Sequence, residues 1–414
     1  MGWRNDPEFN RVLDAIYASF MKRKAAVAGR PDREVRDPAI VLGLVERLGL
    51  GPDPARTIRV TGSKGKGTTA RMIARLLTEE TGGSVGLMVS PEEADHNDRI
   101  RINGEAISKL EFIALHESLS ADLDALDRSL EGDRYVSPFG TFLVLALAKF
   151  HEAKVDYLVL EGGRGARYDE VGGLASKVAV LTSIFDEHPD YLGPEPERIA
   201  EDKLTIGVGS ERLVLDAGST RWNDRLGVVP SERLEVVPDP EPAVELPFWL
   251  ERDKALARAA VAAFLGRPVS DRVDLDGCSA AFGRFPFGEA TAYYDACISA
   301  ASLDLDLLER LAARPDGLAV LASFPDDKDV EGLRAALRDL PAAYGEAALS
   351  GTRGYLHYAQ TLAGPHCLGT IHYESTAALA GLARDLLARS GAETLYCPGT
   401  QTFIRLVKSL DPSG

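Results

Sequence analysis

The sequence is poor in cysteine and in long apolar runs. Its four cysteines, at positions 278, 297, 367 and 397, are widely spaced and form no Cys-x-x-Cys pair, so we expect reduced thiols rather than a disulfide framework. The longest apolar stretch, FLVLALA at 142–148, is far shorter than the roughly 20 residues that span a bilayer. The N-terminus shows no apolar segment of the signal-peptide type. We therefore predict a cytoplasmic protein without a membrane partner.

Basic residues are also scarce relative to acids. The chain has 47 Lys and Arg against 63 Asp and Glu, a net charge of −16, which argues against nucleic acid as a partner. Its hydrophobic and charged fractions, 45% and 27%, are those of ordinary globular proteins and exclude general disorder. At about 150 residues per domain, the 414 residues predict two domains, or three.

Short β-rich runs alternate with helical patterns over most of the chain. Two helical patterns fill residues 7–50. A segment rich in proline and acid covers 225–247, and we interpret it as an excursion or the approach to a domain boundary. The expected strands before that segment lie at 57–60, 85–90, 155–163, 178–185 and 211–216. Such alternation is typical of a mostly parallel sheet flanked by helices. We predict a larger α/β domain with its N-terminal helices over 1–280 and a smaller Rossmann-like α/β domain over 281–414.

The clearest motif is the glycine-rich segment TGSKGKGTT, which lies between a β-rich run and a helical pattern. Backbone N–H groups of such a loop surround phosphates, Lys66 would neutralise their charge, and the Thr68 hydroxyl could reach a bound Mg²⁺. A glycine-rich turn without a ligand is the alternative, but the lysine, the hydroxyl and the context all favour a nucleotide. The residues predicted to bind ATP here are Gly62, Ser63, Lys64, Gly65, Lys66, Gly67, Thr68 and Thr69.

Several segments together resemble the Mur ligase superfamily, specifically its folylpolyglutamate synthase and dihydrofolate synthase branch, whose loop typically reads GTNGKGS. Ser90-Pro91, followed by NDRIRING at 97–104, is similar to the serine-proline segment and arginine-containing strand of that family. The run DYLVLEGG at 156–163 resembles the strand that ends in its magnesium-binding glutamate, here Glu161. The resemblance is dense from 55 to 205 and thin after 215. It implies a P-loop-type central domain and a second α/β domain.

The resemblance implies an ATP-dependent, ADP-forming ligase that activates a carboxylate as an acyl phosphate and transfers it to an amine. It also implies one or two Mg²⁺ ions. Thr68, Ser90 and Glu161 would hold one ion, all through oxygen atoms that suit a hard cation. Glu161, His188 and Lys203 would serve a second, with Lys203 carbamylated so that its ammonium becomes a carboxylate-like ligand. Lys66, His188 and Lys203 are the predicted catalytic residues.

Each of these residues has a plainer alternative. His188 could be an ordinary partly buried histidine, although its place after an apolar strand favours a ligand. Glu161 ends a strand that we expect to be buried, where an acid without a partner would be costly, and this favours a metal role. On the residues alone, Lys203 in AEDKLTIG is a solvated helix lysine, and only the resemblance favours a ligand.

The resemblance also marks residues around the substrates and in the second domain. Arg284 and Asp295 would contact the nucleotide. The predicted substrate-side residues are Arg99, Arg167, Asp169 and Lys328. These sites imply small-molecule partners, a carboxylic acid and an amino acid or related amine, bound by a monomer or a small homo-oligomer.

The chain departs from the family at two places near these residues. Where the family reads Asp-x-Ala-His-Asn-Pro, this chain reads DACISA, so that Ile298 and Ser299 replace the histidine and asparagine. After Ser-Pro, the acids of EEAD at 92–95 form a solvated loop, or they meet a cationic substrate or shape a smaller acceptor site. We therefore predict a ligase of a specialised biosynthetic pathway. A true folylpolyglutamate or dihydrofolate synthase and a degenerate, non-catalytic nucleotide-binding homologue are the alternatives.

Overall fold

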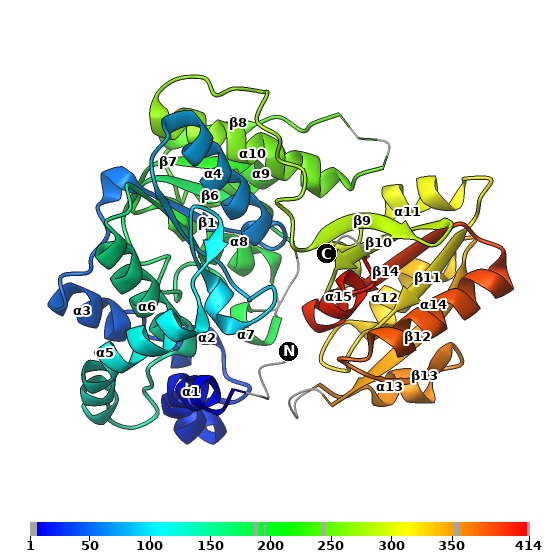
Figure 1. Cartoon of the computed structure of the whole chain (residues 1–414). Coiled ribbons are helices and arrows are strands. Elements are labelled where there is room, and N and C mark those ends of the chain that lie inside the picture. The colour runs from blue at the N-terminus through cyan, green and yellow to red at the C-terminus, as the bar shows by residue number, and fades with distance from the viewer. Residues whose placement is uncertain are drawn as a thin grey trace. The chain divides into compact units, whose positions relative to one another are not determined.

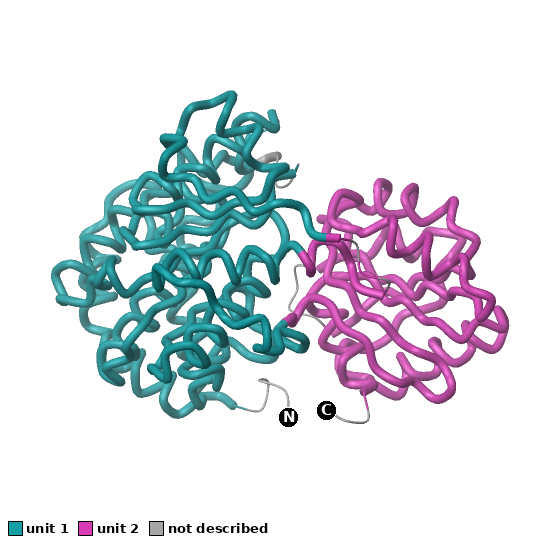
Figure 2. Tube along the Cα trace, turned by 90° about the horizontal axis from the view of Figure 1, so that it is seen from above, with its two compact units in different colours: residues 1–240, 252–278 teal, residues 241–251, 279–414 magenta. Residues whose placement is uncertain are grey.

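The structure, a computed structural model, describes residues 6–185, 189–193, 195–241, 243, 245–351 and 356–411 (Figure 1). The chain divides into two compact units (Figure 2). Residues 1–240 and 252–278 form the first unit, and residues 241–251 and 279–414 form the second. The predicted domain boundary at residue 280 stays a prediction.

The first unit is built on an eight-stranded sheet with the order β4-β3-β2-β5-β1-β6-β7-β8. The neighbouring strands β2, β5, β1, β6, β7 and β8 pair in parallel. Strands β3 and β4 add an antiparallel edge beside β2. Its strands are β1 (Thr57–Thr61), β2 (Val85–Met88), β3 (Ile100–Ile102), β4 (Glu105–Ala106), β5 (Tyr157–Glu161), β6 (Ser176–Leu181), β7 (Ser210–Asp216) and β8 (Leu234–Val237). Every residue of the central strand β1 is buried, because helices cover both faces of a parallel sheet.

Helices cover this sheet, and capping residues mark where several of them begin. In α5, Ser108 and Glu111 form a capping box, and in α6, Ser137 caps the helix ahead of Pro138. The rings of Phe9, Phe112 and Phe142 join α1, α5 and α6 in one core. The helices are α1 (Pro7–Val27), α2 (Asp32–Val35), α3 (Ala39–Arg47), α4 (Lys66–Thr81), α5 (Lys109–Arg128), α6 (Pro138–Ala153), α7 (Pro189–Leu192), α8 (Pro196–Leu204), α9 (Ala217–Leu226) and α10 (Phe248–Leu265).

The second unit contains a six-stranded sheet with the order β13-β12-β11-β14-β10-β9, parallel apart from the β9–β10 hairpin. Its strands are β9 (Phe282–Phe287), β10 (Ala290–Ala296), β11 (Leu318–Ala322), β12 (Ala343–Ser350), β13 (Cys367–His372) and β14 (Thr394–Gly399). Its helices are α11 (Leu305–Ala312), α12 (Val330–Arg338), α13 (Ala359–Ala363), α14 (Thr376–Ser390) and α15 (Gln401–Lys408). Two mostly parallel sheets with flanking helices confirm the predicted fold class.

Other expectations meet a mixed outcome. All four cysteines are free thiols, as expected. No helix within the described part of the chain is long and apolar enough to cross a membrane. The segment 225–247 contains the point where the first unit gives way to the second, after Pro240, in agreement with its interpretation as the approach to a boundary. Part of it forms β8, which pairs in parallel with β7, because the short run LEVV needs no long periodicity to extend an existing sheet.

Candidate active site

The glycine-rich loop connects β1, the central strand, to α4, as a phosphate-binding loop requires. Gly62 and Gly65 both have a positive φ, 146° and 90°, a region that side chains disfavour. A Cβ on Gly62 would overlap Oγ1 of Thr182, so the loop also needs glycine there for space. Helix α4 begins at Lys66, and its first N–H groups face the end of the sheet where strands β1 and β5 terminate.

The segment after β6 fixes the shape of this loop. Ser63 N–H donates to the carbonyl oxygen of Ser183 at 2.9 Å, and Lys64 N–H donates to Oγ of Ser183 at 3.1 Å. In return, the Thr182 hydroxyl donates to the carbonyl oxygen of Lys64 at 2.6 Å. The backbone of the loop is therefore held in place by a neighbouring strand end rather than by its own sequence alone.

Two lysines from different helices converge on the loop. Nζ of Lys66, at the start of α4, and Nζ of Lys203, from α8, each donate to the carbonyl oxygen of Gly62 at 3.0 Å. Lys203 is only 1% exposed, so the alternative of a solvated helix lysine is wrong. Its burial follows from the packing of α8 on the loop, which the sequence AEDKLTIG does not show. The two ammonium groups concentrate positive charge where a phosphate would lie.

Glu161 is the carboxylate of this site. It ends β5, is 2% exposed, and accepts the backbone N–H of Ser90 through Oε2 at 2.8 Å. Burial raises the pKa of Glu161 to about 7, although the positive charge of Lys66 opposes the shift. A Cβ on Gly67 would lie 3.1 Å from Oε2, so the carboxylate packs against the first turn of α4. A buried acid with this environment is suited to a cation.

The predicted metal ligands are brought together only in part. Thr68 is buried in the first turn of α4, next to the residue that Glu161 contacts, and Ser90 follows β2 and bonds to Glu161. These oxygen atoms suit Mg²⁺. Within the described ranges, no three His, Cys, Asp or Glu side chains form a group that could hold a metal ion. The predicted ligand set is of a different kind, because it includes two hydroxyls and a modified lysine. His188 lies outside the described residues, and its role stays a prediction.

Arg99, predicted on the substrate side, is already paired. Its Nε donates to Oε2 of Glu92 at 2.9 Å, and its guanidinium lies 4.4 Å from the ring centroid of Phe142. Both Arg99 and Glu92 are 9% exposed. The first acid after Ser-Pro is thus part of a buried ion pair, and Arg99 supports the loop that carries it.

The remaining acids of the 92–95 segment also have internal partners. Oε2 of Glu93 lies 3.5 Å from Arg71 and 3.6 Å from Arg101, and Oδ2 of Asp95 lies 2.5 Å from Nζ of Lys109. The interpretation as a simply solvated loop is therefore wrong, whereas a role of this segment in meeting a substrate or shaping the acceptor site stays a prediction. The sequence showed the acids but not the bases that the fold places opposite them.

Asp169 is fully buried and holds the loop that follows Glu161. It accepts N–H groups from Gly163 and Val171, each at 3.0 Å, and lies 3.5 Å from Nη2 of Arg36. Burial raises the pKa of Asp169 to about 6, while the charge of Arg36 opposes the shift. Arg36, the C-cap residue directly after α2, thus supplies a base for a carboxylate that we predicted on the substrate side.

Arg167 is the most accessible of the predicted substrate-side residues in the first unit. Its guanidinium pairs with Oε1 of Glu201 at 3.0 Å while 41% of its side chain stays exposed. It borders a cavity of about 70 Å³ together with two further arginines and two tyrosines. The lining residues are Arg33, Arg167, Tyr168, Tyr191, Leu192, Arg198, Glu201 and Asp202.

The predicted residues of the second unit lie on β9, at the end of β10 and after β11. Asp295 is fully buried and accepts the Tyr396 hydroxyl at 2.6 Å; burial and the Asp295 charge together raise the pKa of that phenol. Arg284 is half-exposed and pairs with Glu245. Lys328 pairs with its neighbour Asp327 at 2.7 Å. Their roles toward nucleotide and substrate stay predictions.

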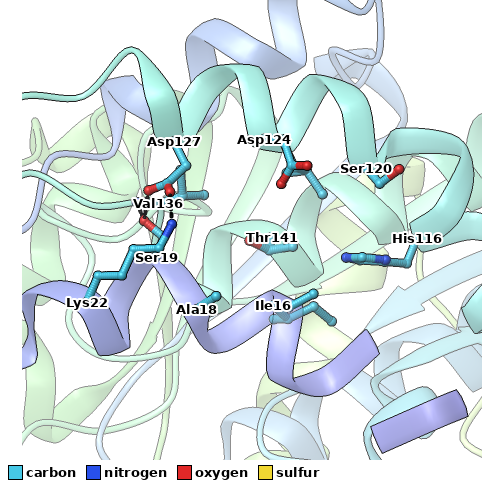
Figure 3. Close-up of a pocket in the computed structure, with 12 residues that line it drawn as sticks. Ile16, Ala18, Ser19, Lys22, His116, Ser120, Asp124, Asp127, Val136 and Thr141 are labelled. Carbon is cyan, nitrogen blue, oxygen red and sulfur yellow. Dashed lines mark hydrogen bonds and ion pairs between the residues drawn. The ribbon is translucent and has the colours of Figure 1, made fainter. Parts of the chain in front are cut away.

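A separate cavity of about 70 Å³ lies among α1, α5 and α6 and contains none of the predicted site residues (Figure 3). Its charged groups satisfy one another: Asp127 accepts the Ser19 hydroxyl at 2.6 Å and lies 2.7 Å from Nζ of Lys22. Burial lowers the pKa of His116, which also lines the cavity. We interpret this cluster as a connection between helices.

Sequence reasoning missed Asp253, whose carboxylate packs against Gly65 of the phosphate loop. A signal existed, because Leu250, Asp253, Ala257 and Ala260 are spaced as one buried helical stripe, and an acid on such a stripe is unusual.

This chain is similar to known proteins in both sequence and structure. No family model matches the chain. The dihydrofolate synthase/folylpolyglutamate synthase of Escherichia coli is 28% identical over 345 residues, which are 74% of this chain and 76% of that protein. That of Bacillus subtilis is 35% identical over 164 residues, 39% of this chain and 37% of that protein. The structure of E. coli FolC in complex with DHPP and ADP matches with a TM-score of 0.68 at 25% identity, over 90% of this chain and 92% of that one.

The chain is similar in sequence and in fold to the dihydrofolate synthases and folylpolyglutamate synthases. A Mycobacterium tuberculosis folylpolyglutamate synthase complexed with ADP and AMPPCP shares the fold at 22% identity, with a TM-score of 0.72 over 95% of this chain and 98% of that one. Folylpolyglutamate synthases are ATP-dependent, ADP-forming ligases that make a C–N bond. The predicted resemblance to this family and the predicted enzyme class are thereby confirmed.

Proposed function

We propose that this Mur ligase-like chain joins a carboxylic acid to an amino acid or related amine in a specialised biosynthetic pathway. A carboxylate oxygen attacks the γ-phosphorus of ATP and ADP leaves, which gives an acyl phosphate. The amine nitrogen then attacks the acyl carbon, phosphate leaves, and the amine gives up a proton as the amide forms. The observation that carries this proposal is the convergence of Lys66 and Lys203 on Gly62, beside the buried Glu161.

The residues of the first unit suit the first step. The backbone N–H groups of the loop and the N-terminus of α4 would bind the phosphates, and Lys66 would neutralise charge on the transferred group. Thr68, Ser90 and Glu161 would hold Mg²⁺, which when bound supplies further neutralisation of the phosphates. A related bifunctional synthase has been solved with Mn, AMPPNP and L-glutamate bound, and this supports both a nucleotide and a divalent ion for this chain.

Carbamylation of Lys203 is part of the proposal. Its side chain is buried beside the phosphate loop, where an ammonium would repel a second cation and a carbamate would attract one. The amine keeps its N–H after carbamylation, so the hydrogen bond to Gly62 could persist.

The substrate side favours an acid other than folate. Asp169 is engaged by Arg36 and by backbone N–H groups, and Arg99 is engaged by Glu92, so neither offers an unused charge to a ligand. Arg167 and the basic cavity beside it are the more accessible groups. We infer that the acid carries a negatively charged group besides the carboxylate that reacts.

A true folylpolyglutamate or dihydrofolate synthase is the second candidate, favoured by the similarity to the E. coli enzyme over three quarters of its length. A non-catalytic homologue is the third, and its support is the loss of the family's histidine and asparagine at Ile298 and Ser299.

The first test measures ADP formation with Mg²⁺ across a panel of carboxylic acids, folates included, each paired with mixed amino acids. Turnover that needs one non-folate acid and one amine supports the proposal. Turnover with folates alone supports the second candidate, and nucleotide binding without turnover for any pair contradicts both. Lys66→Ala serves as the inactive control.

A further inference from the structure

Asp253 is a buried acid beneath the phosphate loop. It lies in the part of α10 that belongs to the first unit, and its side chain is 0% exposed. The neighbouring members of its stripe, Leu250, Ala257 and Ala260, are apolar and buried. An acid at such a position is costly unless its charge is balanced or removed.

The carboxylate touches the last loop residue before α4. A Cβ on Gly65 would overlap Oδ2 of Asp253, so the acid fills the space that a side chain would otherwise occupy. Gly65 has a φ of 90°, and its carbonyl oxygen accepts the N–H of Thr69 at 2.8 Å. The carboxylate therefore packs against the point where the loop turns into the helix, and it supports the conformation that phosphates would meet.

The charge of Asp253 is only partly balanced. Oδ1 accepts a hydrogen bond from Nη2 of Arg252 at 3.2 Å, but Arg252 also lies 3.7 Å from Asp216, at the end of β7. Oδ2 has no hydrogen-bond partner among the residues that the structure describes. Lys64 supplies some attraction from the loop, whereas Asp216 adds repulsion; burial dominates and raises the pKa of Asp253 to about 7.

We propose that Asp253 is a positioning residue of the phosphate loop that takes up a proton when a nucleoside polyphosphate binds there. This rests on the proposed nucleotide site but not on any particular acid or amine. A bound polyphosphate places negative charge on the loop that this carboxylate supports, and like charges repel strongly in a buried environment. Protonation of Asp253 removes the repulsion and leaves its packing against Gly65 unchanged.

The sign of the pH effect follows from linkage. Binding raises the pKa of Asp253 above its value in the free protein, about 7. Above that pH, binding must draw a proton from solution, so affinity falls as pH rises, by up to about tenfold per pH unit until the pKa of the complex is reached. Below that pH, Asp253 is already protonated and affinity is independent of this group.

The experiment measures ADP binding by calorimetry at about pH 6.5, 7.5 and 8.5, in two buffers of different ionisation enthalpy, so that proton uptake is counted directly. Wild-type chain is compared with Asp253→Asn, which keeps the shape and cannot ionise. Glu251→Gln, on the same helix, is the matched control. Subtracting the Asn variant removes the titration of ADP itself and of Glu161.

We expect the wild type to take up most of one proton more than Asp253→Asn at about pH 8, and its affinity relative to that variant to fall roughly tenfold between pH 6.5 and 8.5. Asp253→Ala should weaken binding at every pH, because it also removes the packing against Gly65. Equal proton uptake in wild type and Asp253→Asn overturns the proposal.

If Asp253→Asn does not fold, proton uptake on ADP binding is compared between the wild type and Glu161→Gln, and this comparison still tests the proposal. Uptake beyond that of ADP itself, retained when Glu161 is neutral, supports Asp253, and its absence contradicts the proposal. Failure of ADP to bind at all overturns the nucleotide site as well, whereas pH-independent binding overturns only the role of Asp253.

Discussion

The phosphate loop and the predicted substrate-side loops differ in how far their buried charges are paired. Around the phosphate loop, burial raises the pKa of both Glu161 and Asp253 to about 7. On the substrate side, Arg99 meets Glu92, and Arg36 lies near both Asp169 and Glu170. The acids of the first region are poorly balanced, whereas those of the second have largely completed their own ion pairs. The proposed nucleotide site and the proposed substrate side would therefore depend on different kinds of residue.

The largest effect is expected from Lys66→Ala. The variant loses the ammonium that would neutralise the transferred phosphoryl group, and we expect ADP formation to fall by about a thousandfold. The fold should be unaffected, because Lys66 bonds only to a loop carbonyl in the described structure. Lys24→Ala, an exposed lysine of α1, is the control and should match wild type. Unchanged turnover in Lys66→Ala would sink the assignment of the phosphate loop.

Lys203→Ala tests the second lysine of the loop. We expect a loss of about a hundredfold in turnover, the scale on which metal-site residues act. If Lys203 is carbamylated, added bicarbonate raises wild-type activity, the intact mass shows the carbamate, and a short carboxylate partly restores the variant. A fully active Lys203→Ala, with wild-type mass and activity indifferent to bicarbonate, contradicts the metal role.

Arg36→Ala probes the opposite region, where charges are already paired. It leaves Asp169 and Glu170 buried without their base, so we expect a loss of about 3 kcal/mol in the free energy of unfolding, measured by denaturant titration. The folded-state pKa of Asp169, about 6, lies above its ordinary value and rises further without Arg36. Ionised Asp169 then costs stability, so the loss should be larger at about pH 7.5 than at pH 5.

A destabilisation of Arg36→Ala that does not change with pH would show that Asp169 is not the group left uncompensated. Arg33→Ala, in α2 three residues before Arg36 but on the surface, should change stability by less than about 0.5 kcal/mol.

Short-range sequence patterns predicted the strand, loop and helix around the glycine-rich segment because these parts are contiguous. The loop from Gly62 to Thr69, its strand and its helix lie in one stretch, and Glu161 ends a clear apolar strand. Asp253 acts on Gly65 from far along the chain, and Arg36 reaches Asp169 across 133 residues, so neither partnership leaves a local pattern. The acids at 92–95 were visible, but their bases come from other elements, and only the fold pairs them.

The smallest effect on stability and the sharpest on recognition are expected from Arg167→Ala. Its ion pair with Glu201 is exposed, with 41% and 46% of the two side chains accessible, and such pairs contribute less than about 1 kcal/mol. If Arg167 binds a second negative group of the acid substrate, the variant raises the KM for that acid several-fold while kcat and the KM for ATP stay near wild type.

Glu201→Gln, which breaks the same ion pair but keeps the guanidinium of Arg167, separates a role in binding from a role in the ion pair. It should leave the KM unchanged or lower it, because the guanidinium is then released toward the cavity. A KM for the acid that rises equally in both variants would mean that the ion pair, and not the charge of Arg167, shapes this surface. The acid would then be recognised through the shape of the surface and not through a charge on Arg167.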